Sequence, residues 1–487
     1  FWGLSGGLNS HKDYESGADV IVHNSRFNNN GIHAFAGLNK SFGSFKLYYD
    51  YTKMHLGMTV PGIDTLIHTE ERKNNYWFQD LDNHLLVSKN KFFINNFKLE
   101  TDLSYQQNHR VLQTIEKEAV NMKMSAYSAN FRSNYMISTD TDLIVGLQGS
   151  FKRNQNFDAP NHVLPDHEVY DLAVNSLLQH ELGDGLKTQA GVRYDHRQIN
   201  IPEQEKSGHS HEDEHHEEEE HLEQFNKQYD NLSFSLGATY SITKDILLRG
   251  NFASAYRTPN IAELTQEGIH GARFEVGNRN LNSQKNFEAD LSFHYHCCHA
   301  LLDISGFYNT INDYIFLAAT DETTPENLPI YRYEQTNANL YGGEVSFEIK
   351  PVQNFQGKLT YSKTVGQRRN RSHLPFIPQD KMKGSIRYIV NGFDGFNEPF
   401  FKVSSTYAFR QNNPSRFETE TGSYWLVDIE GGGELMIDKQ EIYISFSVQN
   451  IFDQDYIDHL STLKPLGYHN IGRNLVFTLR LPIDYKL

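Results

Sequence analysis

The 487-residue sequence has no apolar run long enough for a membrane-spanning helix, which argues against a helical membrane protein. It has only two cysteines, Cys297 and Cys298. Because a disulfide between neighbouring residues is strained, no disulfide framework is expected. Positive charge is also scarce, and the formal net charge of -16 disfavours nucleic acid as a partner. No secretory signal segment is visible, so we expect a processed or truncated chain.

Aromatic residues, by contrast, are abundant. The chain contains 27 Tyr and 32 Phe although only 38% of its residues are hydrophobic. A polar average combined with many aromatic residues is typical of a transmembrane β-barrel, because half of each strand faces a wet interior.

Alternation of apolar with polar or small residues recurs along the chain and predicts strands. Clear examples are 143–151, 232–239, 401–410 and 442–449. In the second of these, Leu232, Phe234 and Leu236 alternate with serine and glycine. Alternation alone fits two folds, because a soluble sandwich buries the apolar face whereas an outer-membrane barrel turns it to lipid.

The connections distinguish these two folds, because short turns and long polar loops alternate along the chain. Short turns are expected at 41–44, 89–91, 139–142, 183–185, 243–245, 297–299, 352–354, 392–395 and 438–440. Long loops are expected at 11–30, 57–77, 109–119, 156–168, 200–224, 256–285, 318–337, 367–379, 411–423 and 453–472. Short periplasmic turns and long extracellular loops are typical of an outer-membrane barrel.

The predicted fold class is therefore all-β: a transmembrane antiparallel up-and-down β-barrel, with residues 1–487 as a single domain. About 20 strands are visible, which is more than an open sheet usually carries. The largest outer-membrane transporters have about 22 strands and a plugged lumen. We therefore expect about two further strands and an interior plug to precede this chain.

Four short motifs stand out along the chain: GVRYD at 191–195, YRTPNIAEL at 256–264, NLYGGE at 339–344 and NIFDQDY at 450–456. Together they resemble motifs of the TonB-dependent outer-membrane receptors. The resemblance covers essentially the whole chain and implies a transporter, not an enzyme, in the Gram-negative outer membrane. The implied partners are the lipid and lipopolysaccharide of that membrane, and the TonB energy-coupling complex, which acts through the plug. The sequence itself shows neither plug nor TonB box.

After the Pro motif, the chain contains Glu263, Gly268, His270, Phe274, Glu275, Gly277, Asn278 and Leu281. Within that family, these residues resemble the zinc-uptake branch, in which Gly-x-His and Phe-Glu-x-Gly follow the Pro motif. The resemblance implies that His270 reaches toward the plug and helps to bind the metal. Glu263, Glu267 and Glu275 lie in the same excursion, and carboxylate with imidazole suits a borderline divalent metal. A solvated loop with incidental charges is the alternative.

Three further residues are candidate second ligands to His270, because they lie at strand ends beside the hairpin whose loop is 200–224. They are His167, Glu168 and His196. Near a short turn, His294, His296 and His299 allow two interpretations, an exit-side metal contact or wet interior residues.

Residues 203–223 form one polar run with five His, ten acidic residues and a single Lys. Without apolar periodicity this run cannot pack, and His- and acid-rich tracts bind borderline metals weakly and repeatedly. We predict that the loop at 200–224 captures metal above the barrel mouth, against the alternative of a solvated acidic loop. The expected ligands are His209, His211, Glu212, Asp213, His215, His216 and His221.

The same run contains a zinc-protease pattern, HExxH, at 211–215. That motif requires a helix with a buried apolar face, and every neighbour here is charged or polar, so a protease is disfavoured.

The predicted function is active import of a divalent metal ion, first of all zinc, which is the transported substrate and not a catalytic cofactor. Haem, held by axial His, and a ferric siderophore are the alternative cargoes. A passive porin is a more remote alternative, because it needs an open channel.

Overall fold

The computed structural model describes most of the chain. The described ranges are 1–67, 71–95, 97–115, 117–157, 159–160, 162–205, 221–270, 273–325, 327–393, 395–416, 418–437 and 440–482. Helical structure in these ranges is confined to short segments. They are α1 (Ile261–Thr265) and the 3-10 turns η1 (Ile63–Thr65) and η2 (Lys464–Leu466). None of the helices described is long and apolar enough to cross a membrane.

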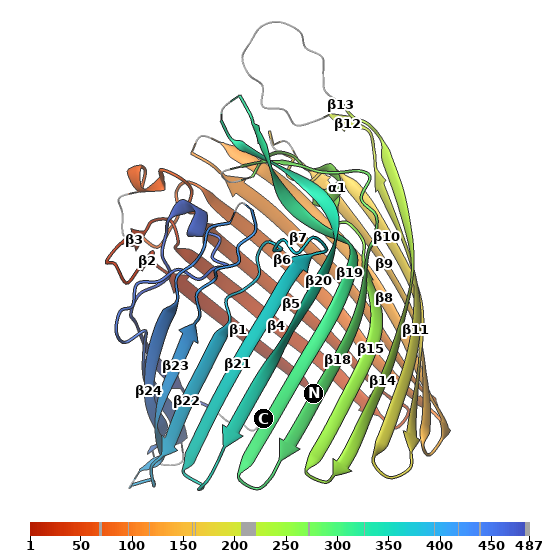
Figure 1. Cartoon of the computed structure of the whole chain (residues 1–487), viewed down its shortest axis with the longest axis vertical. Coiled ribbons are helices and arrows are strands. Elements are labelled where there is room, and N and C mark those ends of the chain that lie inside the picture. The colour runs from red at the N-terminus through yellow and green to blue at the C-terminus, as the bar shows by residue number, and fades with distance from the viewer. Residues whose placement is uncertain are drawn as a thin grey trace, which may run out of the picture.

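The main sheet has 22 strands, of which β16 and β17 form a small hairpin; the other 20 follow one another around a barrel (Figure 1). Their bounds are β1 (Trp2–His11), β4 (Phe27–Lys40), β5 (Gly43–Gly57), β6 (Phe78–Ile94), β7 (Phe97–Gln113), β8 (Glu118–Ser138), β9 (Thr141–Asn156), β10 (His167–Leu182), β11 (Leu186–Ile201), β14 (Phe225–Thr243), β15 (Ile246–Arg257), β18 (Gln284–His296), β19 (Ala300–Thr323), β20 (Pro329–Ile349), β21 (Phe355–Arg368), β22 (Lys381–Ile389), β23 (Phe396–Ala408), β24 (Tyr424–Ile437), β25 (Gln440–Gln449) and β26 (Asn474–Arg480).

Each of these long strands pairs antiparallel with the next one along the chain, from β1 with β4 to β25 with β26. The prediction of an antiparallel up-and-down barrel with about 20 visible strands is therefore confirmed. The expected N-terminal plug and two further strands stay predictions.

Short strands also form within the loops that connect the long strands. They are β2 (Tyr14–Glu15) with β3 (Ile21–Val22), β12 (Gln204–Glu205) with β13 (His221–Leu222), and β16 (Glu267–His270) with β17 (Arg273–Val276).

The apolar face of the strands points outward. On β14, Leu232 and Leu236 are 69% and 53% exposed, whereas Tyr229 and Asn231, at the other parity, are buried. Side chains alternate between the faces of a strand, so the outer wall is apolar and the inner wall polar. This arrangement is that of a membrane barrel and excludes a sandwich.

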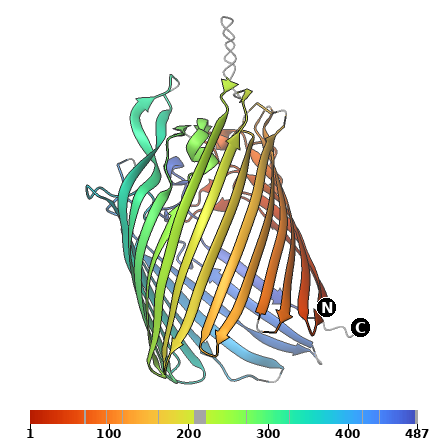
Figure 2. The ribbon, with the colours of Figure 1, turned by 90° about the vertical axis from the view of Figure 1, so that its right-hand side faces the viewer.

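Most short turns gather at one end of the barrel and most long loops at the other, where α1 also lies (Figures 1 and 2). The short turn expected at 89–91 is wrong, because β6 continues to Ile94 and the chain turns at Asn95, which has a left-handed φ of 50°. The loops expected at 109–119 and 318–337 are also wrong for most of their length, because β7, β8, β19 and β20 extend through them. Strand pairing continues there through polar residues. A polar sequence therefore indicates that a segment is exposed to water, but it does not show where the strand ends.

Candidate functional site at the barrel mouth

The chain between β15 and β18 folds back over the mouth of the barrel and packs there. Its apolar residues form one buried cluster with the inner wall, made of Val169, Ile199, Ile201, Tyr229, Ile261, Leu264, Leu281 and Ile315. Burial of these side chains holds the segment against β10, β11, β14 and β19. Residues 258–283 are called the mouth segment below.

Polar contacts anchor the return of the mouth segment. The Lys227 ammonium on β14 donates to the carbonyl oxygens of Arg279 at 2.7 Å and of Leu281 at 2.8 Å. The Tyr229 hydroxyl donates to the same Leu281 oxygen at 3.2 Å. The segment is therefore fixed to the wall at both its apolar and its backbone groups.

Glu263 caps the helix of the mouth segment. Its backbone N–H donates to the Asn260 side chain at 2.8 Å, and its carboxylate accepts from the Asn260 N–H at 2.9 Å, which completes a capping box. Arg257 donates to both carboxylate oxygens, at 2.8 and 2.9 Å. A metal ion at Glu263 would have to displace Arg257.

The hairpin of β16 and β17 extends the mouth segment, and β17 joins β20 in parallel pairing. Glu275 on β17 is buried and accepts hydrogen bonds from Arg273 Nε at 2.7 Å and from the Tyr333 hydroxyl at 3.3 Å. This second carboxylate therefore also has a cationic partner inside the protein.

Of the other two predicted ligands of the hairpin, Glu267 is described with its side chain and His270 in its backbone only. Glu267 begins β16, is exposed, and pairs in register with Val276. His270 ends β16 and its backbone pairs with Arg273; its side chain lies outside the described part of the structure.

The candidate ligands at the ends of β10 and β11 do not lie together. His167 is buried on the inner side, where Nδ1 donates to the Pro165 carbonyl at 2.8 Å. Glu168, at the next position, accepts from the hydroxyl of Tyr170, which is exposed on the outer wall. Consecutive residues of a strand face opposite sides, so Glu168 is not brought to the mouth segment.

His196 also lies on the outer wall. Its Nδ1 is 2.9 Å from Asp230 Oδ1, and the exposed Tyr194 donates to the same oxygen at 2.6 Å. Asp195, at the opposite parity, is buried beside Arg193 instead. The expectation that His196 reaches an interior site is therefore not met.

In the described ranges, no group of three or more His, Cys, Asp or Glu side chains is arranged to hold a metal ion. Most of the predicted capture ligands lie outside those ranges: His209, His211, Glu212, Asp213, His215 and His216. The HExxH pattern at 211–215 lies outside them too. His221 is described in its backbone only, which pairs with Glu205 in the β12–β13 ladder.

The inner wall beneath the mouth segment is polar and charged. Arg197 forms an ion pair with Asp171 and also donates to the Thr258 hydroxyl at 2.7 Å, at the start of the mouth segment. Arg193 forms an ion pair with Asp195 at 2.7 Å. Such a wall suits a hydrated lumen.

Sequence reasoning missed a buried histidine that joins two neighbouring loops. His459 Nδ1 lies 2.7 Å from the Thr421 hydroxyl and 3.3 Å from the Lys464 ammonium. An ammonium can only donate, so Nδ1 is the acceptor, and the ring proton is on Nε2, which is 3.7 Å from Glu418 Oε1. A single His in a polar loop carries no sequence signal.

Next to it, Asp458 accepts from Lys381 at 2.5 Å and from the Tyr424 hydroxyl at 2.8 Å. Burial, the largest effect, and the nearby Lys464 lower the pKa of His459. The contacts of His459 and Lys464 join the loop at 450–473 to the loop at 409–423, and those of Asp458 join it to β22 and β24. The residues Thr421, Asp458, His459 and Lys464 are called the roof lock below.

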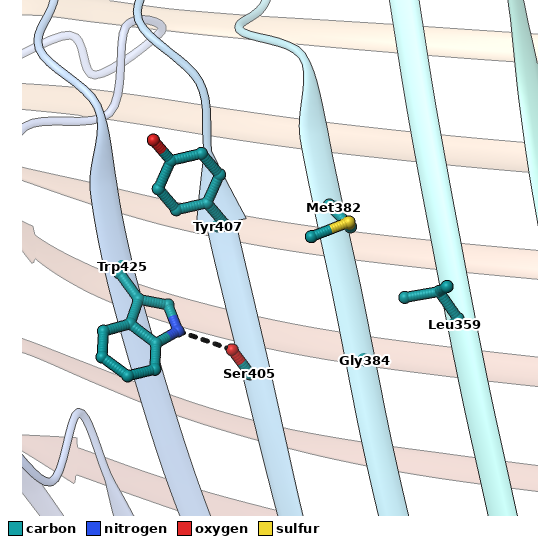
Figure 3. A pocket seen from close by; sticks show the side chains of 6 residues that line it. All are labelled: Leu359, Met382, Gly384, Ser405, Tyr407 and Trp425. Carbon is teal, nitrogen blue, oxygen red and sulfur yellow. Dashed lines mark hydrogen bonds between the residues drawn. The ribbon is translucent and has the colours of Figure 1, made fainter.

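A groove of about 340 Å³ crosses β21 to β24 on the outer wall (Figure 3). It is lined by Leu359, Met382, Gly384, Ser405, Tyr407 and Trp425. Trp425 donates its indole N–H to the Ser405 hydroxyl at 2.7 Å. Because Leu359 and Trp425 are exposed on the apolar outer face, this groove faces lipid and does not belong to the route through the lumen.

Comparison with known proteins gives the family. The family model described as "TonB dependent receptor-like, beta-barrel" matches residues 3–451. The copper transporter OprC has a similar structure, with a TM-score of 0.82, 13% identity, and coverage of 98% of this chain and 75% of that one. The FrpB iron transporter of Neisseria meningitidis (F3-3 variant) has a TM-score of 0.72 at 13% identity, covering 98% and 76%.

A haem-related receptor is similar too. A double mutant of the Serratia marcescens hemophore receptor HasR, in complex with its hemophore HasA and heme, has a TM-score of 0.71 at 13% identity, covering 97% of this chain and 74% of that one. At such identities these structures establish the fold and not the cargo. Since the family model spans most of the chain, the protein belongs to the TonB-dependent receptors, which are outer-membrane barrels of Gram-negative bacteria that work with TonB.

Proposed function

We propose that this receptor imports a divalent metal ion, with zinc as the first candidate, in a cycle driven through TonB. The observation that carries the proposal is the run at 203–223, with five His and ten acidic residues. Its flanking strands β12 and β13 rise from β11 and β14, at the loop end of the barrel (Figure 1). A metal-binding tract at this place would raise the metal concentration at the entrance.

Below the tract, the mouth segment supplies the second stage. His270 and the exposed Glu267 belong to one hairpin, and imidazole with carboxylate is a suitable donor set for zinc. Glu263 and Glu275 are held by Arg257 and Arg273, so we assign them to the support of the hairpin and helix before any role as ligands. The remaining ligands would come from the plug, whose TonB-driven rearrangement would release the ion inward.

The similar proteins include a copper transporter and an iron transporter, which supports import of a metal without specifying zinc. Two arginines of the mouth segment lie over aromatic rings, Arg273 over Tyr331 at 5.0 Å and Arg279 over Phe225 at 5.5 Å. These contacts favour a second candidate cargo, a ferric siderophore or haem. Arginine and aromatic walls suit an anionic aromatic ligand. A passive porin has no such support.

The first test is anomalous diffraction from zinc-soaked crystals of the full-length receptor, with data collected on both sides of the zinc absorption edge. A strong peak at His270 or within 203–223 is expected. Ordered loops without a peak at either place would move haem or a siderophore to first rank.

The second test is zinc uptake by cells that carry the receptor. Replacing 206–220 by a Gly/Ser linker of equal length should lower uptake at limiting zinc and leave it nearly unchanged at high zinc, because the tract only concentrates the ion. His270→Ala should lower uptake at both concentrations. Gln228→Ala, on the outer wall of β14, is the matched control. Zinc uptake that is independent of TonB, or equal in all variants, would contradict the proposal.

A further inference from the structure

The turn between β18 and β19 lies at the end of the barrel opposite the mouth, among the short turns (Figure 1). In this family's orientation that end faces the periplasm. The turn carries Cys297 and Cys298, the two cysteines of the chain, followed by His299. Both thiols are free and exposed. Free thiols are unusual in an oxidising compartment, and a disulfide between these neighbours would be strained.

The two thiols have different surroundings. Cys298 Sγ lies 2.8 Å from His299 Nδ1, so an imidazole nitrogen contacts this thiol directly. Hydrogen bonds from the backbone N–H of His299, the largest effect, from the Tyr295 hydroxyl and from the backbone N–H of Ala300 lower the pKa of the Cys297 thiol. Cys297 is therefore engaged by the turn backbone and by Tyr295, whereas Cys298 and His299 form a side-chain donor pair.

We propose that Cys298 Sγ and His299 Nδ1 bind a thiophilic monovalent d10 metal ion, Cu(I), at the periplasmic rim of the barrel. Thiolate and imidazole are soft and borderline donors that select such an ion. Structural zinc sites almost always have four ligands. The described residues hold no group of three or more ligands, whereas Cu(I) is satisfied by two donors.

The binding step releases one proton. The Cys298 S–H bond breaks as the sulfur–metal bond forms, and Nδ1 contributes its lone pair, so the ring proton must be on Nε2. A hydrogen bond from the thiol to Nδ1 already selects that tautomer. Because two-coordinate Cu(I) is close to linear, the two donor atoms must move from their 2.8 Å contact to about 4 Å apart, which their exposed positions in the turn permit.

Further imidazoles precede the turn on the same strand. The His294 and His296 rings are 5.4 Å apart, and His294 Nδ1 is 2.5 Å from Asp303 Oδ1. His294 and His296 share one face of β18, and Cys298 follows in the turn after the strand ends. The proposed site therefore follows two other imidazoles along the chain. The inference does not depend on the imported cargo, because binding at the turn can be measured without transport.

The experiment is a Cu(I) titration of the purified full-length receptor, under anaerobic conditions with ascorbate, followed by thiolate-to-copper charge-transfer absorption. The His-rich tract has no cysteine and so does not contribute to this band, and the C298S variant tests whether the band comes from the turn. The band should saturate at one copper per chain. C298S should abolish it, and H299N should weaken binding by about tenfold or more, which is the loss of about 1.4 kcal/mol or more. C297S, the matched control, should keep it.

Several results would overturn the inference: no band in the unaltered receptor, a band that survives in C298S, or a band lost in C297S. Displacement of the copper by an equal concentration of Zn2+ would overturn the assignment to Cu(I). Retention of heat-modifiable gel mobility by each variant shows that the barrel is folded. Failure of the zinc-import proposal would appear in uptake and would leave this band unchanged.

Discussion

At the scale of single residues, the charged groups at the loop end of the barrel are held in specific pairs. His459 is buried among Thr421, Lys464 and Glu418, and its lowered pKa results mainly from that burial. In an unfolded loop a His has a pKa of about 6.5. Below that pH the open form binds a proton that the closed form does not, so the contribution of His459 to loop closure is complete above it and declines as the pH falls.

We therefore predict that the roof lock opens on acidification. Hydrogen exchange at 418–423 and 453–472, corrected for intrinsic rates, should speed up between pH 7.5 and 5.5. In His459→Gln this extra acceleration should be absent, since glutamine does not titrate. Equal acid responses of the two proteins would rule out His459 as the cause.

The pair of Arg257 and Glu263 makes the second residue-scale prediction. Arg257→Ala leaves a buried carboxylate without its cation. Because the Arg257 side chain is 40% exposed, solvent reduces the cost, and we expect about 1–3 kcal/mol of local destabilisation. Faster exchange or proteolysis at 258–283 measures it.

The double variant Arg257→Ala, Glu263→Gln should recover part of this loss, because the buried charge is gone. Arg249→Ala, at an exposed position of the same strand, is the control and should have little effect. No recovery in the double variant would show that the ion pair is not what stabilises the helix.

At the scale of elements, the mouth segment depends on contacts with the barrel wall for its position. Sequence reasoning located it correctly as the excursion after Arg257, because proline ends the strand pattern there. It did not find that Ile261, Leu264 and Leu281 pack onto the wall. The five apolar partners of these residues come from four other strands, so no local sequence pattern predicts these contacts.

Lys227→Met tests this anchoring. The variant loses two hydrogen bonds from an ammonium to backbone carbonyls, at Arg279 and Leu281. We expect about 1–3 kcal/mol of local destabilisation, seen as faster exchange at 278–283 with unchanged barrel assembly. Gln228→Met, one residue further on and facing outward, should not change exchange there. Equal effects of both would indicate a general defect of β14.

At the scale of the whole molecule, the barrel is organised by which face of each strand meets lipid. Leu236 is exposed on the outer wall, and Ser235, its neighbour, lines a cavity of about 430 Å³ that Arg193 and Gln148 also line. Leu236→Arg should destabilise the barrel by about 2–4 kcal/mol if the site is near the bilayer midplane.

Ser235→Arg should cost much less, since the cavity has room and polar partners. Denaturant titrations of the two variants folded into vesicles give both values. Similar costs for the two substitutions would contradict the assignment of the faces.

The sequence by itself determined the strand count, the apolar outer face and the family, because alternation, turn parity and short motifs are local features of the chain. Only the tertiary structure decided which carboxylates already have cationic partners, that Glu168 and His196 face outward, and that His459 is buried. These depend on strand register and on contacts between residues far apart in the chain, such as Lys381 with Asp458. Polarity also misplaced the ends of β7 and β19, because hydrogen-bonded pairing extends beyond the membrane whatever the side chains are.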